Sequence, residues 1–358
     1  PAPVIARSTT KFEMAAIRQQ MSGRIDSLVW EKRTMPKPEP GDVVVQVAAT
    51  GLNFRDVMWS MGLLPEEALE DGFAGATLGM EIAGVVVAVG KGVQGFAPGD
   101  RVMGIGPAAF STHVKVNYEG LISVPEGISL ESAATVPVAF LTAWYAMVEL
   151  GRIRAGETIL IHGAAGGVGL AALQVARLKG ARVIATAGTV EKRRFLSMLG
   201  AEHVFDSRSL DFVTDVLNVT DGQGVDLVLN SLFAEAMERS FELVKPFGRF
   251  LELGKRDYYS DRKLALRPFR RNISYFGIDA DQLLVKAPEL TRRVFGELAA
   301  LFAQGKLTPL PFRAFRYDET ASAFRLMQNA GHIGKIVVLP PAPGQDLSLI
   351  HISEPTRP

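Results

Sequence analysis

The sequence contains no cysteine, and this absence removes several kinds of chemistry at once. Disulfide bonds, thiolate metal sites and a cysteine nucleophile are all excluded. A protein without disulfides fits a reducing compartment, so we expect a cytoplasmic location. The formal net charge is only +1 over 358 residues. The composition therefore gives no indication of binding to nucleic acid or to an anionic membrane surface.

Long hydrophobic runs are also missing. Gly, Pro or charged residues interrupt the apolar stretches before they reach about 18 residues, so no membrane span is predicted. The start, Pro1-Ala2-Pro3-Val4, lacks the basic and then apolar pattern of a signal peptide. The absent initiator Met fits a processed chain or a segment of a longer one. With 47% hydrophobic and 22% charged residues, the composition is ordinary for a globular protein.

Residues 1–137 are predicted to form a compact, strand-rich unit. Two β-branched runs, 43–47 and 83–89, are bounded by turn signals such as Pro40-Gly41-Asp42 and Pro98-Gly99-Asp100. Short strands with turns of this kind favour a β-rich domain over a helical one.

Residues 138–300 change to an alternation of strands and helices. Strands are expected over 158–162, 182–186, 225–230 and 248–253, and helices over 167–179 and 191–199. This order predicts an α/β unit, a doubly wound parallel sheet with helices on both faces.

The remaining residues are expected to return to the first unit. Residues 301–340 combine a helix with a closing strand over 335–339 and are predicted to fold back onto the β-rich part. Residues 341–358, rich in proline and polar residues, are expected to be a disordered or non-native tail and are left out of the fold.

A glycine-rich turn joins the first strand of the α/β unit to its first helix. It reads Ala164-Ala165-Gly166-Gly167-Val168-Gly169, and it combines little side-chain bulk with a helix that starts at once. Backbone N–H groups and the positive end of a helix are what a pyrophosphate needs. In this strand–turn–helix context the motif predicts a dinucleotide site, with contacts from Ala165, Gly166, Gly167 and Val168.

No acidic residue follows the second strand. An NAD site places one there to accept a hydrogen bond from the ribose 2′-OH. Thr186-Ala187-Gly188-Thr189 has none, and Lys192 follows closely with two arginines. Cations and hydroxyls suit a 2′-phosphate, so NADPH is the expected cofactor, with Thr186, Gly188 and Lys192 as contacts. The alternative is that at least one of the three cations only forms a solvated helix face.

No metal site is predicted. The five histidines stand at positions 113, 162, 203, 332 and 351, without paired spacing, and cysteine ligands are absent. The usual catalytic zinc sphere cannot form from these residues. Reduction of an activated double bond is therefore favoured over a reaction that needs a Lewis acid to polarise an alcohol.

Several motifs together resemble a known family. The chain is similar to zinc-free medium-chain dehydrogenase/reductases, and most closely to the enoylreductase domains of type I polyketide synthases and animal-type fatty acid synthases. The resemblance covers residues from roughly 20 to 340. The motifs that carry it are Gly51-Leu52-Asn53-Phe54-Arg55-Asp56-Val57-Met58, Leu78-Gly79-Met80-Glu81, His162 to Gly169, Gly254-Lys255, and His332-Ile333-Gly334-Lys335.

The resemblance implies a GroES-like substrate domain split around an inserted Rossmann domain, with the active site in the cleft between them. It implies that hydride from NADPH reaches Cβ of a trans-2-enoyl thioester and that Cα is then protonated, as in fatty acid biosynthesis. It also implies an acyl carrier protein and neighbouring synthase domains as partners. Zinc-dependent relatives have His where this chain has Met80, in agreement with a metal-free reaction.

Two residues match the proposed proton donors of the family, Lys255 and Asp279. The alternative for them is an ion pair that only shapes the cleft. A third family candidate, a tyrosine, is replaced here by Leu64, which cannot donate a proton. This departure leaves the stereochemistry at Cα of a branched substrate open.

Further residues are expected near the nicotinamide end of the cofactor. Asn53 is an amide within an apolar segment, and it either faces the cofactor or makes a structural bond to the backbone. The others follow strands or belong to the matched motifs, and they are Thr142, Asn230, Ser231, Leu232, Leu253, Gly254 and Lys335. Arg55 and Asp56 are expected to have a local role in holding the fold.

Two other functions share this sequence pattern. One is a free-standing quinone oxidoreductase or enone reductase of the same branch. The other is an inactive NADPH-binding scaffold domain within a synthase. Both a monomer and a homodimer fit the sequence.

Overall fold

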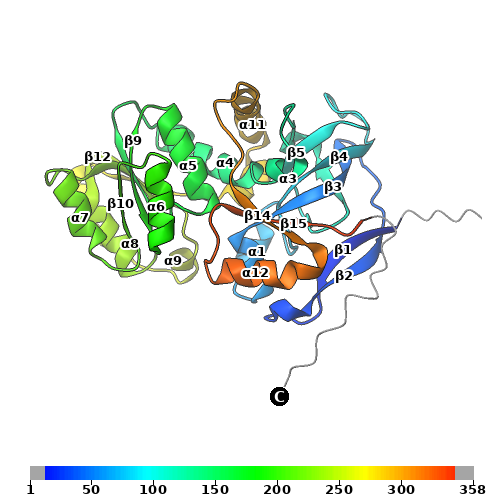
Figure 1. The fold of residues 1–358 in the computed structure, drawn as a ribbon, viewed down its shortest axis with the longest axis horizontal. Helices are drawn as coiled ribbons and strands as arrows, with labels where there is room; N and C mark the ends of the chain where they lie inside the picture. Colours follow the sequence, from blue (N-terminus) through cyan, green and yellow to red (C-terminus); the bar gives the residue numbers. More distant parts are fainter. Residues whose placement is uncertain (1–12, 343–358) are drawn as a thin grey trace, which may run out of the picture.

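The computed structural model describes residues 13–342. Two halves lie side by side along the long axis of the molecule, one built on an open parallel sheet and the other on a mostly antiparallel one (Figure 1). This confirms the predicted doubly wound sheet beside a β-rich unit. The chain start lies outside the described residues, and so does the tail predicted for residues 341–358, except for its first two positions.

The parallel sheet has six strands in the order β10-β9-β8-β11-β12-β13. All neighbouring pairs in it are parallel. The order reverses between β8 and β11, and in sheets of this kind ligands bind at the carboxyl ends of the strands beside that reversal. The strands are β8 (Thr158–Ile161), β9 (Arg182–Ala187), β10 (His203–Asp206), β11 (Val225–Asn230), β12 (Val244–Glu252) and β13 (Ser274–Gly277).

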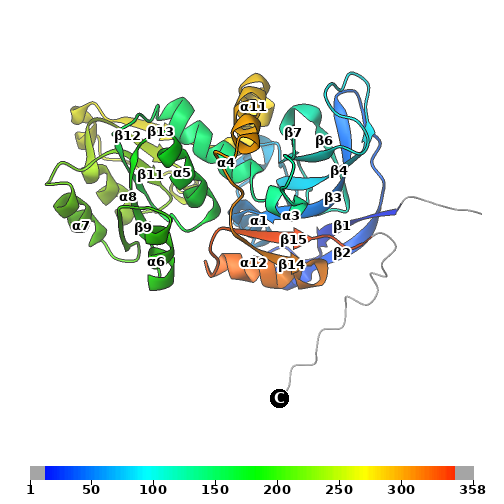
Figure 2. The same ribbon diagram turned by 45° about the horizontal axis from the view of Figure 1, so that its top comes forward.

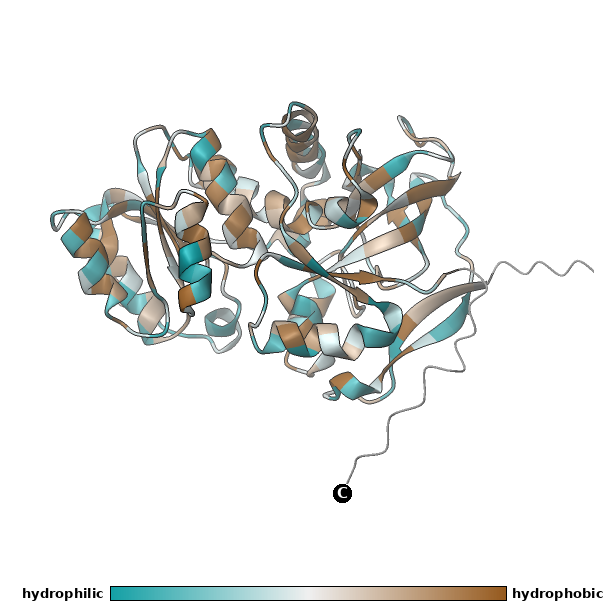
Figure 3. Ribbon diagram, viewed as in Figure 1, coloured by the Kyte–Doolittle hydropathy of each residue, from teal (hydrophilic) through white to brown (hydrophobic). Residues whose placement is uncertain are grey.

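Helices cover this sheet, and those flanking it carry apolar and polar residues on different sides (Figure 3). The helix after the glycine-rich turn buries Leu170, Leu173 and Val175 against the strands. It ends just before Gly180, whose φ of +73° is the left-handed conformation expected at the end of a helix. The helices are α5 (Gly167–Leu178), α6 (Val190–Met198), α7 (Phe212–Val219), α8 (Glu235–Ser240) and α9 (Arg256–Tyr259).

The β-rich half is assembled from both ends of the chain. Ile336 of the last strand lies opposite Leu52 in an antiparallel pair, and Figures 1 and 2 show the orange and red C-terminal strands beside the blue N-terminal ones. The strands are β1 (Glu13–Gln19), β2 (Leu28–Thr34), β3 (Asp42–Leu52), β4 (Glu81–Val89), β5 (Arg101–Ile105), β6 (His113–Asn117), β7 (Leu121–Ser123), β14 (Phe312–Arg316) and β15 (Lys335–Leu339). The helices are α1 (Phe54–Ser60), α2 (Glu67–Glu70), α3 (Leu130–Ala133) and α12 (Thr320–Gln328).

Apolar helices join the two halves. Phe140, Phe295 and Phe302 belong to a core cluster that also contains strand residues of both sheets. The helices are α4 (Pro137–Trp144), which continues as a π-helical segment (Tyr145–Leu150), α10 (Leu283–Lys286) and α11 (Pro288–Ala303). The predicted boundary at residue 300 falls inside α11, and the division into domains stays a prediction. Short 3-10 turns are η1 (Ile25–Ser27), η2 (Tyr118–Gly120), η4 (Phe241–Leu243), η5 (Arg267–Arg271), η6 (Ala280–Gln282) and η7 (Tyr317–Glu319).

One helical stretch of the described residues, Leu130–Leu150, is long and apolar enough to cross a membrane by length and composition. No such stretch was expected from the sequence, because Pro137 interrupts it. In the structure Pro137 stands at the first turn of α4, where the missing N–H costs nothing. Since 67% of the apolar window is buried and Phe140 and Trp144 lie in the core, this is a core helix.

Candidate active site and cofactor site

The glycine-rich turn lies at the reversal point of the parallel sheet. Gly163 has a φ of +60°. The amide of Ala164 donates to the carbonyl of Thr186 at 3.0 Å, and this bond holds the turn against β9. Gly166 is the N-cap of α5 and supplies no side-chain cap. The first amides of a helix point out of its N-terminus, so this end is open to an anionic ligand.

Two glycines are required here by close packing. A Cβ at Gly169 would lie 2.5 Å from Cα of Ala164, and one at Gly167 would lie 2.7 Å from Cδ of Lys335. The first contact lets α5 start directly against the turn, and the second brings the C-terminal strand next to it. The amide of Gly334 also donates to the carbonyl of Ala165 at 2.8 Å. The residues present therefore fit a dinucleotide whose pyrophosphate lies on the N-terminus of α5.

A cluster of cations surrounds the carboxyl end of β9. Nζ of Lys192 donates to the carbonyl of Ala330 at 2.6 Å. Burial, and then the nearby Arg208 guanidinium, lower the pKa of Lys192. A Cβ at Gly188 would lie 2.9 Å from Nε of Arg208. The sequence prediction included Gly188 and Lys192 but missed Arg208, which follows β10 and reaches the same sheet edge because β9 and β10 are parallel neighbours.

The Thr186 side chain does not face this cluster. It is fully buried, and its hydroxyl lies 2.9 Å from Nδ1 of His162. The other ring nitrogen of His162 lies 3.0 Å from the Ser240 hydroxyl. The Thr186 hydroxyl thus fixes the strand ends, and its carbonyl is taken by the amide of Ala164, so the contact of Thr186 with the cofactor stays a prediction.

The strand ends of β11 and β12 are tied together by a buried carboxyl, that of Glu252. Its Oε2 accepts from Nδ2 of Asn230 at 2.7 Å and its Oε1 from the amide of Gly254 at 2.6 Å. The side chain of Asn230 also bonds the backbone of Leu232, and the Ser231 hydroxyl donates to the carbonyl of His162. Asn230, Ser231, Leu232, Leu253 and Gly254 therefore lie together at the carboxyl ends of β11 and β12, and their place around the nicotinamide stays a prediction. Glu252 was not singled out from the sequence.

We expect Glu252 to make stability depend on pH. Burial raises its pKa from 4.5 to about 7. Its contribution to the free energy of unfolding is fully present below pH 4.5 and is lost as the pH rises to about 7, because the unfolded chain releases the proton first. In wild type, this ionisation lowers the free energy of unfolding by about 3 kcal/mol as the pH rises from 4.5 to about 7. Glu252→Gln has no such ionisation and loses this part of the pH dependence. Urea denaturation at pH 5 and pH 7.5 measures the difference. Equal slopes in the two proteins would contradict the raised pKa.

Lys255 and Asp279 form an ion pair at the same sheet edge. Nζ of Lys255 lies 3.1 Å from Oδ1 of Asp279 and donates to the carbonyl of Ile278 at 2.7 Å. Asp279 also accepts from Nε2 of Gln282 at 3.2 Å. Burial lowers the pKa of Lys255, and Asp279 opposes this effect. The side chain of Lys255 stays 27% exposed, so it is accessible, and its pKa lies below that of an ordinary lysine.

A second ion pair next to it crosses between the two halves. Nε of Arg55 on α1 lies 3.0 Å from Oδ2 of Asp281. Arg55 also donates to the carbonyls of Gly75 and Thr77. The expected local role holds for Asp56, which accepts from the amides of Asn53 and Gly79. Arg55 in addition reaches the other half of the molecule, which the sequence did not indicate.

Asn53 and Lys335 meet at a buried carboxylate, Glu81. Nζ of Lys335 donates to Glu81, to Oδ1 of Asn53 at 2.9 Å and to the carbonyl of Leu52 at 3.0 Å. Nδ2 of Asn53 donates to Glu81 at 2.9 Å, and so does the amide of Val138 at 2.8 Å. Lys335 and Glu81 are 4% and 0% exposed. All three ammonium hydrogens of Lys335 have protein acceptors, so its predicted contact with the cofactor is not visible in this geometry.

Thr142 and Met80 complete the predicted positions. Both are buried, Thr142 on α4 and Met80 just before β4. Among the described residues, no group of three or more His, Cys, Asp or Glu side chains is placed to hold a metal ion. The metal-free reaction remains a prediction from the sequence.

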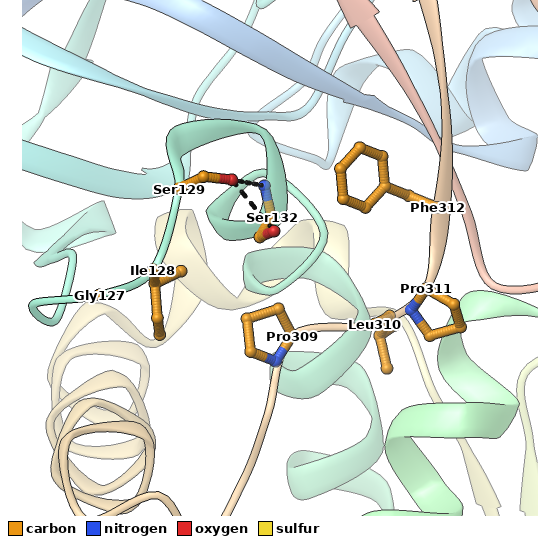
Figure 4. Close-up of a pocket in the computed structure, with 8 residues that line it drawn as sticks. All are labelled: Gly127, Ile128, Ser129, Ser132, Pro309, Leu310, Pro311 and Phe312. Atoms are coloured by element: carbon orange, nitrogen blue, oxygen red, sulfur yellow. Dashed lines mark hydrogen bonds between the residues drawn. The ribbon is translucent and has the colours of Figure 1, made fainter.

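A surface groove of about 590 Å³ lies beside the Pro309–Phe312 segment, which pairs with the strand of Lys335, but none of the predicted site residues lines it. Figure 4 shows Ser129 and Ser132 on one side and the Pro309–Phe312 segment on the other. Its two serine hydroxyls bond each other at 3.1 Å, and Ser129 also caps α3. The groove therefore has no free titratable group and is not the candidate active site.

Comparison with known proteins identifies the family. Residues 39–142 match the alcohol dehydrogenase GroES-like domain, and residues 199–338 match the zinc-binding dehydrogenase family. The chain is 42% identical over 345 residues to a phenolphthiocerol/phthiocerol polyketide synthase polypeptide of Mycobacterium tuberculosis. That match covers 95% of this chain but only 16% of the synthase polypeptide.

Solved structures agree. The CurK enoyl reductase is 38% identical with a TM-score of 0.85, and the match covers 92% of this chain and 99% of that one. The CurF ER cyclopropanase from the curacin A biosynthetic pathway is 33% identical with a TM-score of 0.84, with coverages of 92% and 99%. The β-rich half is therefore GroES-like, and the fold goes with a nicotinamide cofactor and a reductase role in polyketide synthesis. The chain belongs to the polyketide synthase enoylreductases, within the medium-chain dehydrogenase/reductase superfamily.

Proposed function

We propose that this chain reduces a trans-2-enoyl thioester to the saturated thioester with NADPH as the hydride donor. The observation that carries the proposal is the Lys255–Asp279 pair, a partly exposed lysine and its carboxylate partner just beyond the carboxyl ends of β12 and β13. The glycine-rich turn at the same edge supports the cofactor assignment. When bound, the nicotinamide supplies a hydride, which reaches Cβ of the substrate.

The protein must then handle the charge that develops on the substrate. Hydride addition at Cβ leaves an enolate on the thioester, which needs a hydrogen-bond donor at oxygen and a proton at Cα. Lys255 serves as the proton donor to Cα. Asp279 and the carbonyl of Ile278 orient its ammonium, while burial makes it a stronger acid than a lysine in water. Leu64 takes no part in proton transfer, so the configuration of a branched Cα depends on the substrate pose.

Discrimination for NADPH rests on Lys192 and Arg208 beside Gly188. We expect Lys192→Glu or Arg208→Glu to raise the Kd for NADPH by about tenfold to a hundredfold, because each replaces a charge-assisted bond to the 2′-phosphate with repulsion. The Kd for NADH changes far less. Titration of cofactor fluorescence measures both constants.

Arg194→Glu is the matched control for these variants. Arg194 lies on the same helix and is exposed, so its charge belongs to the solvated face. If it changed the NADPH preference as much as Lys192→Glu, the preference would come from the general field of the helix and not from a built phosphate site.

The acyl group is expected to arrive on the phosphopantetheine arm of an acyl carrier protein, within a larger cytoplasmic synthase. The chain spans only 16% of the length of the curated synthase that it matches, so neighbouring synthase domains are proposed partners. The protein is proposed to work as a monomer or a homodimer.

Steady-state oxidation of NADPH with crotonyl-pantetheine tests the proposal. Consumption that depends on the enoyl thioester supports it. Turnover with quinones alone would favour a quinone reductase. Tight NADPH binding without turnover on any enoyl thioester or quinone would favour an inactive scaffold.

A further inference from the structure

Asp281 is a nearly buried carboxylate that serves both halves of the molecule. Its Oδ2 lies 3.0 Å from Nε of Arg55, and the two side chains are 9% and 14% exposed. Its Oδ1 accepts from the amide of Ala74 at 3.0 Å, and its own carbonyl accepts from the amide of Phe73. A Cβ at Gly72 would clash with this carboxylate. The loop 72–77 and α1 are thus bound to the segment that carries Asp279.

The same carboxylate belongs to the electrostatic surroundings of Lys255. Asp279, Asp281 and Glu252 all raise the pKa of Lys255 against the effect of its burial. Only Asp279 makes an ion pair with it, at 3.1 Å. The Tyr258 ring also lies on this side, with its centre 5.7 Å from Nζ of Lys255. Tyr259 is a further neighbour. Burial raises the pKa of Tyr259, and the charges of Asp279, Arg55, Asp281 and Glu67 also act on it. Lys255 therefore faces more carboxylates than it bonds.

We propose that Arg55 is a positioning residue for the proton donor. By holding Asp281 in a bridge between the two halves, it leaves Asp279 as the ion-pair partner of Lys255 and so fixes the position of the ammonium beside the carbonyl of Ile278. The proposal rests on the proposed function, in which Lys255 donates the proton. Arg55, on the side of the substrate domain, would thus set the acidity of Lys255, on the side of the nucleotide domain.

The charges predict opposite effects for the two partners. Arg55→Met leaves Asp281 negative and unpaired, so Lys255 holds its proton more tightly. Asp281→Asn leaves the Arg55 cation unmatched near Lys255, so Lys255 loses its proton more readily. The double variant removes both charges and returns Lys255 close to its original state.

The pH dependence of Lys255 acetylation, followed by peptide mass spectrometry, measures this acidity without any turnover. Arg55→Met is expected to lower the labelling rate at pH 8 by about tenfold, and Asp281→Asn to raise it by a similar factor. The double variant labels like the wild type. The basic limb of the pH profile of kcat/KM for an enoyl thioester follows the pKa of Lys255, so it shifts upward for Arg55→Met and downward for Asp281→Asn.

A purely structural role for the pair predicts a different pattern. Both single variants would then change labelling in the same direction, and the double variant would be at least as altered as either; that result overturns the proposal. If Arg55→Met does not fold, Asp281→Asn and the double variant still test the proposal. Adding Arg55→Met to Asp281→Asn must then return the labelling rate of Lys255 toward the wild-type value. Lack of enoyl reduction by the wild type would refute the proposed function and leave the labelling result readable.

Discussion

Replacing Lys255 with alanine will lower kcat for an enoyl thioester by about 10²–10⁴-fold, the usual contribution of a positioned acid. The Kd for NADPH will change by less than about threefold. The reason is geometric: the Lys255 ammonium bonds Asp279 and the carbonyl of Ile278 at the sheet edge. The predicted phosphate contacts belong to the turn and to the end of β9. Stopped-flow turnover and cofactor titration separate the two constants.

Lys263→Ala provides the control for Lys255→Ala. Lys263 is 84% exposed and pairs with the exposed Asp261, so we expect its removal to leave both constants unchanged. Equal losses of kcat and NADPH affinity in Lys255→Ala would place Lys255 in the cofactor site. An unchanged kcat would reduce the Lys255–Asp279 pair to a structural ion pair.

Replacing Lys335 with methionine will lower the free energy of unfolding by about 3–5 kcal/mol, because it leaves Glu81 as an uncompensated buried charge. Glu81 is 0% exposed and keeps only the neutral donors of Asn53 and Val138. Lys335→Met/Glu81→Gln will recover part of the loss, since the double variant buries no charge. Urea denaturation of the three proteins measures the differences.

Lys286→Met is the matched control for this experiment. The ammonium of Lys286 pairs with Asp71 at the surface, where both side chains are more than half exposed, so we expect a change within about 0.5 kcal/mol. If Lys335→Met kept its stability but lost NADPH affinity, the contact between Lys335 and the cofactor predicted from the sequence would be correct after all.

Local patterns predicted the elements that form the sheet edge. The strand expected over 225–230 is β11, and the helix expected over 167–179 is α5, shorter by one residue. These elements have strong local signals: β-branched runs for strands, and helical apolar spacing closed by Gly180. The strand expected over 248–253 is the second half of β12, which starts at Val244. Pro246 hid its first half, where the pairing is irregular.

The contacts that were missed depend on tertiary pairing. Arg208 reaches the end of β9 only because β10 lies next to it in the sheet. Asp281 pairs with Arg55, which is more than 200 residues away in the sequence, and no local pattern around either residue predicts the pair. Thr186 was chosen for its hydroxyl, but the period of a strand decides which face a side chain takes, and this one faces His162.

The most direct test of the central claim follows the hydride itself. Crotonyl-pantetheine is incubated with the protein and NADPH carrying deuterium at both hydrogen positions of nicotinamide C4, and the butyryl product is analysed by NMR and mass spectrometry. We expect deuterium at Cβ from the cofactor and a solvent proton at Cα. Oxidation of the labelled NADPH without deuterium at Cβ, or no reduction of the thioester at all, would contradict it.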